Sequence, residues 1–163
     1  MKQKKIIGIT GGVGAGKSSV LAVLKNDFGA KIILADLVAH DLMEPGSLGL
    51  RKVTEALGTS FLTPDGAVDR KALADLIFRD KEALKTMNSI IHPLVWKTMK
   101  EEAEAASENL VIIEAAVFDT APKNFFDELW YVYTTKENRI VRLMENRGYS
   151  REKCEDIIGR QAS

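Results

Sequence analysis

The chain has 163 residues, of which 45% are hydrophobic and 28% charged, which is typical of one globular domain with a single core. Basic and acidic residues number 23 each, so no net charge attracts the chain to nucleic acid or to an anionic membrane, and neither is expected as a partner. One cysteine, Cys154, excludes an internal disulfide and a multi-cysteine metal site. The apolar run near the N-terminus is too short for a signal peptide or a membrane span, so we expect a cytoplasmic protein.

The beginning of the chain predicts a strand, a helix and a second strand. The run KKIIGIT (4–10) has the length and apolar content of a short buried strand. Over residues 17–28, apolar side chains recur on one helical face, and Gly29 follows as a stop signal. KIILA (31–35) is a second apolar run. A strand, a helix and a strand in this order form a βαβ unit, which implies a parallel sheet.

The middle of the chain predicts helices only. A helical stretch over 37–44 ends at Glu-Pro-Gly, and further helical patterns fill residues 47–108. Asp69 and Asp80 are predicted helix N-caps, and Pro93 is predicted to lie in the first turn of a helix. Because this helical block stands between strands, we predict an insertion over 37–108 that covers one side of a ligand site.

The last part of the chain returns to alternating strands and helices. NLVIIE (109–114) and ELWYVYTT (128–135) are predicted strands, and helical patterns follow over 136–147 and from 150 onward. The alternation predicts an α/β domain with a doubly wound parallel sheet. We expect a single domain over 1–163, whose core is made of residues 1–36 and 109–147, with a lid and a following helix over 147–163.

The loop after the first strand is rich in glycine. GITGGVGAGKSS (8–19) matches G-x-x-x-x-G-K-[S/T], and it stands between a strand and a helix as that motif requires. Glycine lets backbone N–H groups turn toward a phosphate, and the helix N-terminus adds positive charge. Lys17 would reach the β- and γ-phosphates, and the Ser18 hydroxyl would bind Mg²⁺. We predict a P-loop NTPase-type fold that binds a nucleoside triphosphate, against the alternative of a structural turn; the contact residues are Gly11, Gly12, Val13, Gly14, Ala15, Gly16, Lys17, Ser18 and Ser19.

Other residues narrow the class of nucleotide-binding protein. A GTP-binding protein would carry Asn-Lys-x-Asp after a late strand, where this chain has KENR (136–139), and the chain is too short for a motor ATPase. A small-molecule kinase needs an acidic base near the P-loop. Asp36 follows the second strand, at the edge where parallel sheets bind ligands. We predict that Asp36 is this catalytic base, acting with Lys17; the alternative is that its carboxylate caps the following helix.

Several segments beyond the P-loop form a recognisable series: ILADLVAHDLMEPG (33–46), DGAVDRKALADLIF (65–78), IIHPLV (90–95) and RLMENRGYSREKCEDIIGRQAS (142–163). Together with the P-loop, they resemble the dephospho-CoA kinase family over nearly the full length of the chain. The resemblance implies ATP- and Mg²⁺-dependent phosphorylation of the ribose 3′-hydroxyl of dephospho-CoA, the last step of coenzyme A biosynthesis. The family's catalytic aspartate falls on Asp36.

Two positions depart from the family pattern. The second strand usually ends in Asp-Ala-Asp, but here it ends in Leu34-Ala35-Asp36, so one acidic group is missing. The third strand is often followed by Pro-Leu-Leu, whereas Glu114 stands at the proline position. Glu114 ends a buried strand at the ligand edge, so it is either a water-mediated Mg²⁺ contact or a structural carboxylate.

The resemblance also implies roles for basic residues in the later segments. Arg142 and Arg147 match an Arg-Leu-x-x-x-Arg segment that closes as a lid over ATP, although most such clusters are solvated helix faces. His92 precedes the family's proline and is either an acceptor-binding or a packing residue. Arg70 could bind the diphosphate of the acceptor, but its place in a helical first turn is equally ordinary.

The family continues beyond this point with another strand and helix, so the resemblance implies that a C-terminal strand and helix are missing here. From this we expect weak ATP binding or slow turnover. The sequence predicts no oligomeric state. Two other functions stay open: a nucleoside or nucleotide kinase of the same architecture, and a nucleotide-binding module without catalysis.

Overall fold

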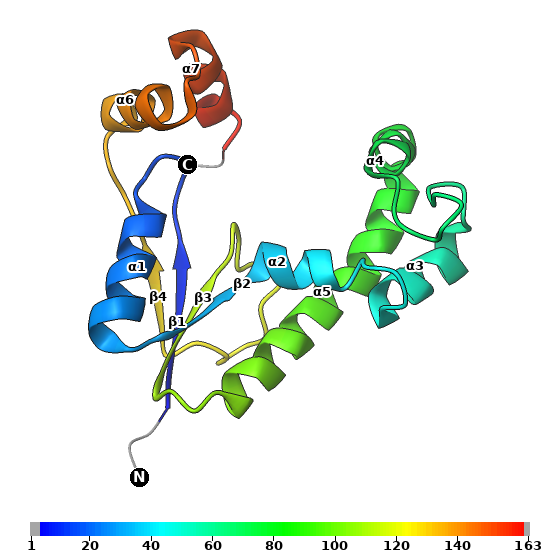
Figure 1. Ribbon diagram of the computed structural model, residues 1–163, viewed down its shortest axis with the longest axis horizontal. Helices are drawn as coiled ribbons and strands as arrows, with labels where there is room; N and C mark the ends of the chain where they lie inside the picture. The colour runs from blue at the N-terminus through cyan, green and yellow to red at the C-terminus, as the bar shows by residue number, and fades with distance from the viewer. Residues whose placement is uncertain (1–3, 162–163) are drawn as a thin grey trace. The chain divides into compact units, whose positions relative to one another are not determined.

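Four strands form one sheet in the computed structural model, which describes residues 4–161 (Figure 1). They are β1 (Lys5–Thr10), β2 (Lys31–Leu34), β3 (Leu110–Glu114) and β4 (Glu128–Tyr131), in the order β2-β3-β1-β4. β1 pairs in parallel with both β3 and β4. Parallel neighbours that are not consecutive in the chain require crossover connections, and helices lie between β1 and β2 and between β2 and β3. This arrangement confirms the predicted α/β, doubly wound class.

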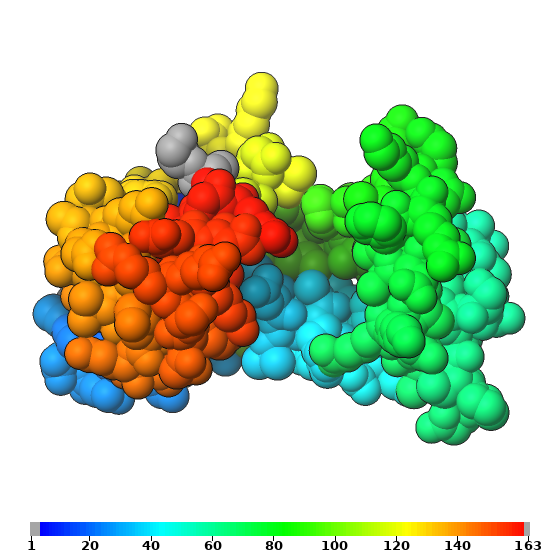
Figure 2. Space-filling view, turned by 90° about the horizontal axis from the view of Figure 1, so that it is seen from above, coloured from blue at the N-terminus to red at the C-terminus, as the bar shows by residue number. Residues whose placement is uncertain are grey.

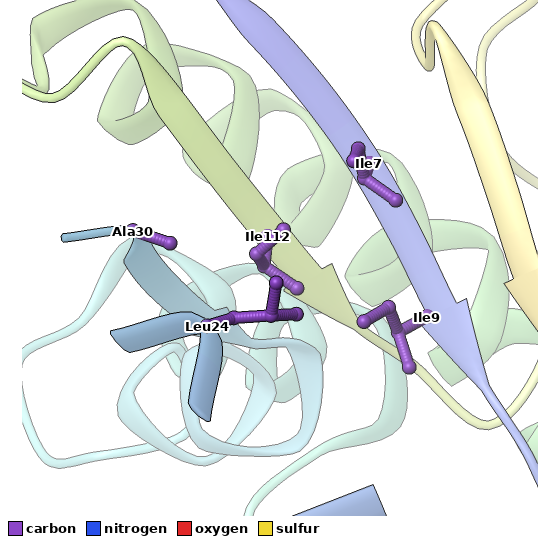
Figure 3. Close-up of a cluster of buried hydrophobic side chains, with 5 residues drawn as sticks. All are labelled: Ile7, Ile9, Leu24, Ala30 and Ile112. Atoms are coloured by element: carbon purple, nitrogen blue, oxygen red, sulfur yellow. The ribbon is translucent and has the colours of Figure 1, made fainter. Parts of the chain in front are cut away.

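The core of the sheet forms where α1 (Lys17–Phe28) packs against it. Ile7 and Ile9 of β1 and Ile112 of β3 meet Leu24 of α1 and the adjacent Ala30, all buried (Figure 3). After α1, the chain turns at a glycine with a left-handed φ of 63°, whose N–H donates to the Leu24 carbonyl. Because this cluster fixes both β1 and α1, the loop between them is held at its two ends.

α6 (Lys136–Arg147) and α7 (Arg151–Gly159) follow β4 and form the orange-to-red surface in Figure 2. The side chains of Thr135 and Ser150 cap the two helices by accepting backbone N–H bonds. Ile140 and Leu143 of α6 pack with Cys154 of α7 in a small buried cluster. The single cysteine is therefore a core residue of this helix pair.

The chain divides into two compact units, which we call the sheet unit and the helical unit. The sheet unit contains the residues up to Ile33 and those from Ala106 onward. The helical unit, Leu34–Ala105, contains α2 (Ala35–Asp41), α3 (Leu48–Leu57), α4 (Arg70–Arg79) and α5 (Lys81–Ala105). Within it, α5 packs against the other three helices.

Both predicted N-caps of the helical unit are confirmed. The Asp69 carboxylate accepts the N–H groups of Lys71 and Ala72 at 3.0 Å, which starts α4. The Asp80 carboxylate accepts those of Glu82 and Ala83 at 2.9 and 3.1 Å, which starts α5. Each carboxylate satisfies helix donors that have no partner inside the helix.

The predicted role of Pro93 is wrong, because this proline lies inside α5 rather than in a first turn. Proline removes one backbone donor and favours a helix start when only local sequence is considered. Here Ile91 lies before it and Val95 and Met99 after it, all buried. Packing of these side chains keeps one continuous helix across the proline.

Two boundaries also differ from the prediction. α2 begins at Ala35, so Asp36 lies in a helical first turn rather than before it. β4 ends at Tyr131, although the Val132 N–H still donates to the Thr10 carbonyl at 2.8 Å before the chain turns toward α6. Among residues 4–161, no helix combines the length and the apolar content that crossing a membrane requires.

Candidate active site

The glycine-rich loop, residues 11–16, joins β1 to α1. Gly14 and Gly16 have φ angles of 76° and 101°, in the left-handed region that glycine adopts without strain. The Ala15 N–H donates to the Gly12 carbonyl at 3.0 Å, so the loop turns tightly. Gly16 is the N-cap of α1 and has no side chain with which to cap the helix. The donors at the start of α1 are therefore left for another acceptor.

These donors are the backbone N–H groups of Gly14, Gly16, Lys17 and Ser18, which have no acceptor within residues 4–161. They cluster at the N-terminus of a 12-residue helix, where the helix dipole gives a partial positive charge. Unpaired N–H groups that converge on a helix N-terminus favour an anion, and a phosphate group in particular.

Lys17 adds a full positive charge at the same place. Its Nζ atom donates to the carbonyl oxygen of Gly11 at 2.5 Å and lies 3.4 Å from that of Gly12. The two residues that follow, Ser18 and Ser19, are exposed. Lys17 therefore provides the cation, and the serines provide hydroxyl oxygens, beside the unpaired N–H groups.

A pocket of about 840 Å³ opens over the loop, a volume typical of small-molecule sites. The predicted loop residues from Gly12 to Ser19 line it. Glu114, Arg142 and Arg147 line it too, so the structure brings together these sequence-selected side chains from β3 and α6. Gly11 does not line the pocket; a Cβ there would run into the Val132 carbonyl, so close approach requires this glycine.

Side chains of α6 bind the carbonyl oxygens of the loop. Arg139 Nε donates to the Val13 carbonyl at 2.8 Å, and its Nη2 donates to Gln161 Oε1. The same Gln161 oxygen accepts the Val13 N–H at 3.0 Å. Arg142 Nη1 donates to the Ala15 carbonyl at 3.0 Å and lies 3.4 Å from the Gly14 carbonyl. The loop is thus held by two arginines and a glutamine from distant parts of the sequence.

Sequence reasoning gave no site role to three residues at this site, Tyr133, Asn146 and Arg139, and matched Gln161 only weakly, to the end of the family's lid. Tyr133 and Asn146 line the pocket, and Arg139 and Gln161 bind the loop. Asn146 lies four positions after Arg142 on the same helical face, so helix periodicity was a signal for it. Gln161 follows α7 and reaches Val13 only through the fold, so its contact with the loop has no local signal.

Two exposed ion pairs join elements of the sheet unit, one between α6 and α7 and one at the end of the sheet opposite the loop. Glu137 of α6 accepts two hydrogen bonds from Arg151 of α7, at 2.9 and 2.8 Å, and these lower the pKa of Glu137 while they raise that of Arg151. At the sheet, Lys5 and Trp130 donate to the Glu128 carboxylate and lower its pKa. Both carboxylates are therefore held in their charged form, where they tie neighbouring elements together.

Asp36 lies in the helical unit, in the first turn of α2, and its side chain is exposed. Leu34 is the N-cap residue and makes no side-chain cap bond. Asp36 and Arg70, the first residue of α4, line the same pocket of about 420 Å³. His40 and Glu44 also line it, 3.4 Å apart between imidazole Nδ1 and carboxylate Oε1. The structure therefore brings a carboxylate and a guanidinium to one pocket.

His92 is the predicted residue that the structure does not bring to this pocket. It lies on α5 and is exposed, and it is absent from the lining of the pocket that contains Asp36 and Arg70. Its exposure excludes a packed core histidine, and its position in the middle of α5 excludes a helix cap. Its role as an acceptor contact stays a prediction.

Within residues 4–161, no three His, Cys, Asp or Glu side chains are arranged to hold a metal ion. Mg²⁺ that accompanies a nucleotide takes most of its ligands from phosphate and water, so a complete protein cage is not needed. Ser18 and Glu114 supply oxygen atoms to one pocket, and oxygen is the ligand that Mg²⁺ prefers. The residues present fit such an ion.

Known proteins provide an independent comparison. The family model described as "Dephospho-CoA kinase" matches residues 5–163. A dephospho-CoA kinase of Carboxydothermus hydrogenoformans is 36% identical over 153 residues, which span 91% of this chain and 74% of that protein. One from Staphylococcus haemolyticus is 35% identical over 98% of this chain and 80% of its own length. The solved dephospho-CoA kinase of Campylobacter jejuni, 24% identical, shares the fold with a TM-score of 0.66 over 98% of this chain and 81% of that one.

Proposed function

The chain belongs to the dephospho-CoA kinase family, and we propose that it transfers the γ-phosphoryl group of ATP to the ribose 3′-hydroxyl of dephospho-CoA, giving coenzyme A and ADP. The observation that carries this function is the P-loop, where unpaired N–H groups meet the Lys17 ammonium beneath a pocket of about 840 Å³. Family membership supplies the acceptor, and the loop supplies the phosphate chemistry.

The P-loop would bind the triphosphate through backbone donors and Lys17. In the transfer, a bond forms between the 3′-oxygen and the γ-phosphorus while the bond to the β–γ bridging oxygen breaks, and negative charge moves toward ADP. Lys17 and the N–H groups of the loop stabilise that charge, because they are fixed donors that need no reorganisation. Arg142 and Arg147 line the same pocket and would add positive charge over the phosphates.

Mg²⁺ would be held by Ser18, with Glu114 as a water-mediated contact, and when bound it neutralises charge on the β- and γ-phosphates. Both side chains line the pocket over the loop. Ser18 is exposed, so its hydroxyl is accessible to an ion.

Asp36 would accept the proton of the 3′-hydroxyl as the new bond forms. Its carboxylate is exposed and lines a pocket of the helical unit together with Arg70. Arg70 would bind the diphosphate of the acceptor, since guanidinium groups match phosphate oxygens in bidentate geometry. His92 is proposed as a second acceptor contact, on family resemblance alone.

A cytoplasmic location also belongs to this proposal. It rests on the single cysteine, which is buried and free, as is usual for proteins of a reducing compartment.

Acceptor specificity tests the proposed function. The chain is incubated with ATP and Mg²⁺ and with dephospho-CoA, its 3′-deoxy analogue, or a panel of nucleosides and nucleotides, and products are identified by mass spectrometry. We expect phosphorylated product from dephospho-CoA and none from the 3′-deoxy analogue. Product from a nucleoside or nucleotide, with none from dephospho-CoA, would establish the rival kinase activity instead.

A further inference from the structure

Val13, in the middle of the P-loop, has both of its backbone polar groups bound by side chains. Its carbonyl accepts from Arg139 Nε at 2.8 Å, and its N–H donates to Gln161 Oε1 at 3.0 Å. Arg139 Nη2 also donates to that Gln161 oxygen, so the three residues close a ring of hydrogen bonds. The ring joins the loop to α6 and to the segment after α7.

This ring fixes the direction of the next backbone donor. In a trans peptide, the carbonyl of one residue and the N–H of the next are held in a plane and point in opposite directions. When Arg139 holds the Val13 carbonyl, it therefore also fixes the direction of the Gly14 N–H. That N–H has no acceptor within the described part of the chain and belongs to the cluster that favours a phosphate.

Glycine at position 14 makes such control necessary. Gly14 has a φ of 76°, and because glycine has no Cβ its backbone can also adopt other conformations at little cost in free energy. A loop that is free to rotate this peptide would lose the donor, and a bound phosphate would then have to order it. A charged hydrogen bond to the Val13 carbonyl orders this peptide before the ligand binds, and it therefore reduces the conformational entropy that is lost on binding.

The neighbouring Gly12 shows how closely Arg139 approaches the loop. A Cβ on Gly12 would overlap the Arg139 guanidinium, whose Nη1 would lie 2.8 Å from it. Gly12 does not have a positive φ, so its own backbone does not require glycine. The close approach of Arg139 therefore explains why a residue without a side chain stands at position 12.

We propose that Arg139, oriented by Gln161, is a positioning residue that directs the Gly14 N–H toward the phosphates of ATP. The inference rests on the proposed function only in taking ATP as the ligand. Arg139 does not line the pocket over the loop, and it acts on the ligand through the Val13–Gly14 peptide.

ATP binding to the full chain, measured by calorimetric titration with Mg²⁺, tests this role without an acceptor. We expect Arg139→Met to raise the Kd for ATP by about tenfold, the size of one charged hydrogen bond, and Arg139→Lys to recover part of the loss. Gln161→Ala, at an exposed position where folding is not at risk, should raise the Kd by roughly threefold. Arg160→Gln, which removes the adjacent charge paired with Asp156, should leave the Kd unchanged.

A packing control separates positioning from stability. Ile140→Val shortens a buried side chain on α6, next to Arg139, in the cluster against which Val13 packs, and it leaves the hydrogen bonds of the ring in place. We expect it to lower the melting temperature and to leave the Kd for ATP unchanged. An amide spectrum adds a direct readout, because the Gly14 N–H resonance should shift on ATP addition in the wild type and shift less in Arg139→Met.

A double-mutant cycle with Gly12→Ala completes the test. In the wild-type background, Gly12→Ala should displace Arg139 and raise the Kd for ATP about tenfold. In an Arg139→Ala background, the same substitution should raise the Kd about twofold or less. The proposal would be overturned if Gly12→Ala raised the Kd for ATP equally in both backgrounds, or if Arg139→Met left the Kd unchanged. It would also be overturned if Ile140→Val raised the Kd as much as Arg139→Met. If the variants changed ATP binding as expected but the chain transferred no phosphoryl group to dephospho-CoA, the proposed function would be wrong and the positioning role of Arg139 would still hold.

Discussion

The loop of the sheet unit and the pocket of the helical unit are built from different chemical groups. The loop presents backbone N–H groups, and its carbonyl oxygens are held by Lys17, Arg139 and Arg142. The pocket of the helical unit presents exposed side chains, Asp36 and Arg70, from the first turns of two short helices. Binding at the loop should therefore depend on backbone geometry, and binding at the helical pocket on the charge of single side chains.

The largest effect is expected at Lys17. Lys17→Ala removes the cation beside the unpaired N–H groups, so both ATP affinity and turnover should fall, with kcat reduced by roughly 10³-fold or more. The control is Lys25→Ala, which removes an exposed lysine from the last turn of the same helix. Turnover within about threefold of wild type would show that the loop binds phosphate without this cation.

Asp36→Asn should give the next largest effect and should sharpen the contrast between the units. We expect kcat to fall by roughly 10²–10⁴-fold, or about 3–5 kcal/mol, because an amide cannot accept the hydroxyl proton. The Kd for ATP should stay unchanged, since the loop is intact. Asp41→Asn, on the same helix but outside the pocket lining, serves as the control. If Asp36→Asn kept normal turnover, Asp36 would have no role as a base.

A smaller effect is expected at Arg70. Arg70→Gln should raise the KM for dephospho-CoA by about tenfold while the KM for ATP stays within about twofold, because only the acceptor diphosphate loses a partner. Arg79→Gln, in the last turn of the same helix, is the matched control. An increase in the KM for ATP instead would break the assignment of the two substrates to different units.

The smallest effect concerns the exposed pair of Glu137 and Arg151. Arg151 lowers the pKa of Glu137 below its ordinary value of 4.5, so the pair stabilises the fold fully above pH 4.5 and loses this contribution as the pH falls through the lowered pKa. Urea unfolding of wild type and Glu137→Gln should therefore differ slightly at neutral pH and converge as the pH falls below 4.5 and through the lowered pKa of Glu137. A difference that grew toward low pH would have the wrong sign for this pair.

Sequence reasoning succeeded where the signal was local. The strand, glycine loop and helix over residues 4–28 follow from side-chain periodicity and one motif, and the caps at Asp69 and Asp80 follow from residue type. Pro93 was misplaced because packing on both sides of it outweighs its local preference. The contact of Gln161 with Val13 was not predicted because the two residues meet only through long-range folding.

The most direct test of the whole account is release of ADP from ATP and Mg²⁺ by the 163-residue chain, with and without dephospho-CoA. The account predicts release that depends on dephospho-CoA and disappears in both Lys17→Ala and Asp36→Asn. Release at the same rate with and without dephospho-CoA would contradict it, because the P-loop would then hydrolyse ATP without transferring the phosphoryl group to this acceptor.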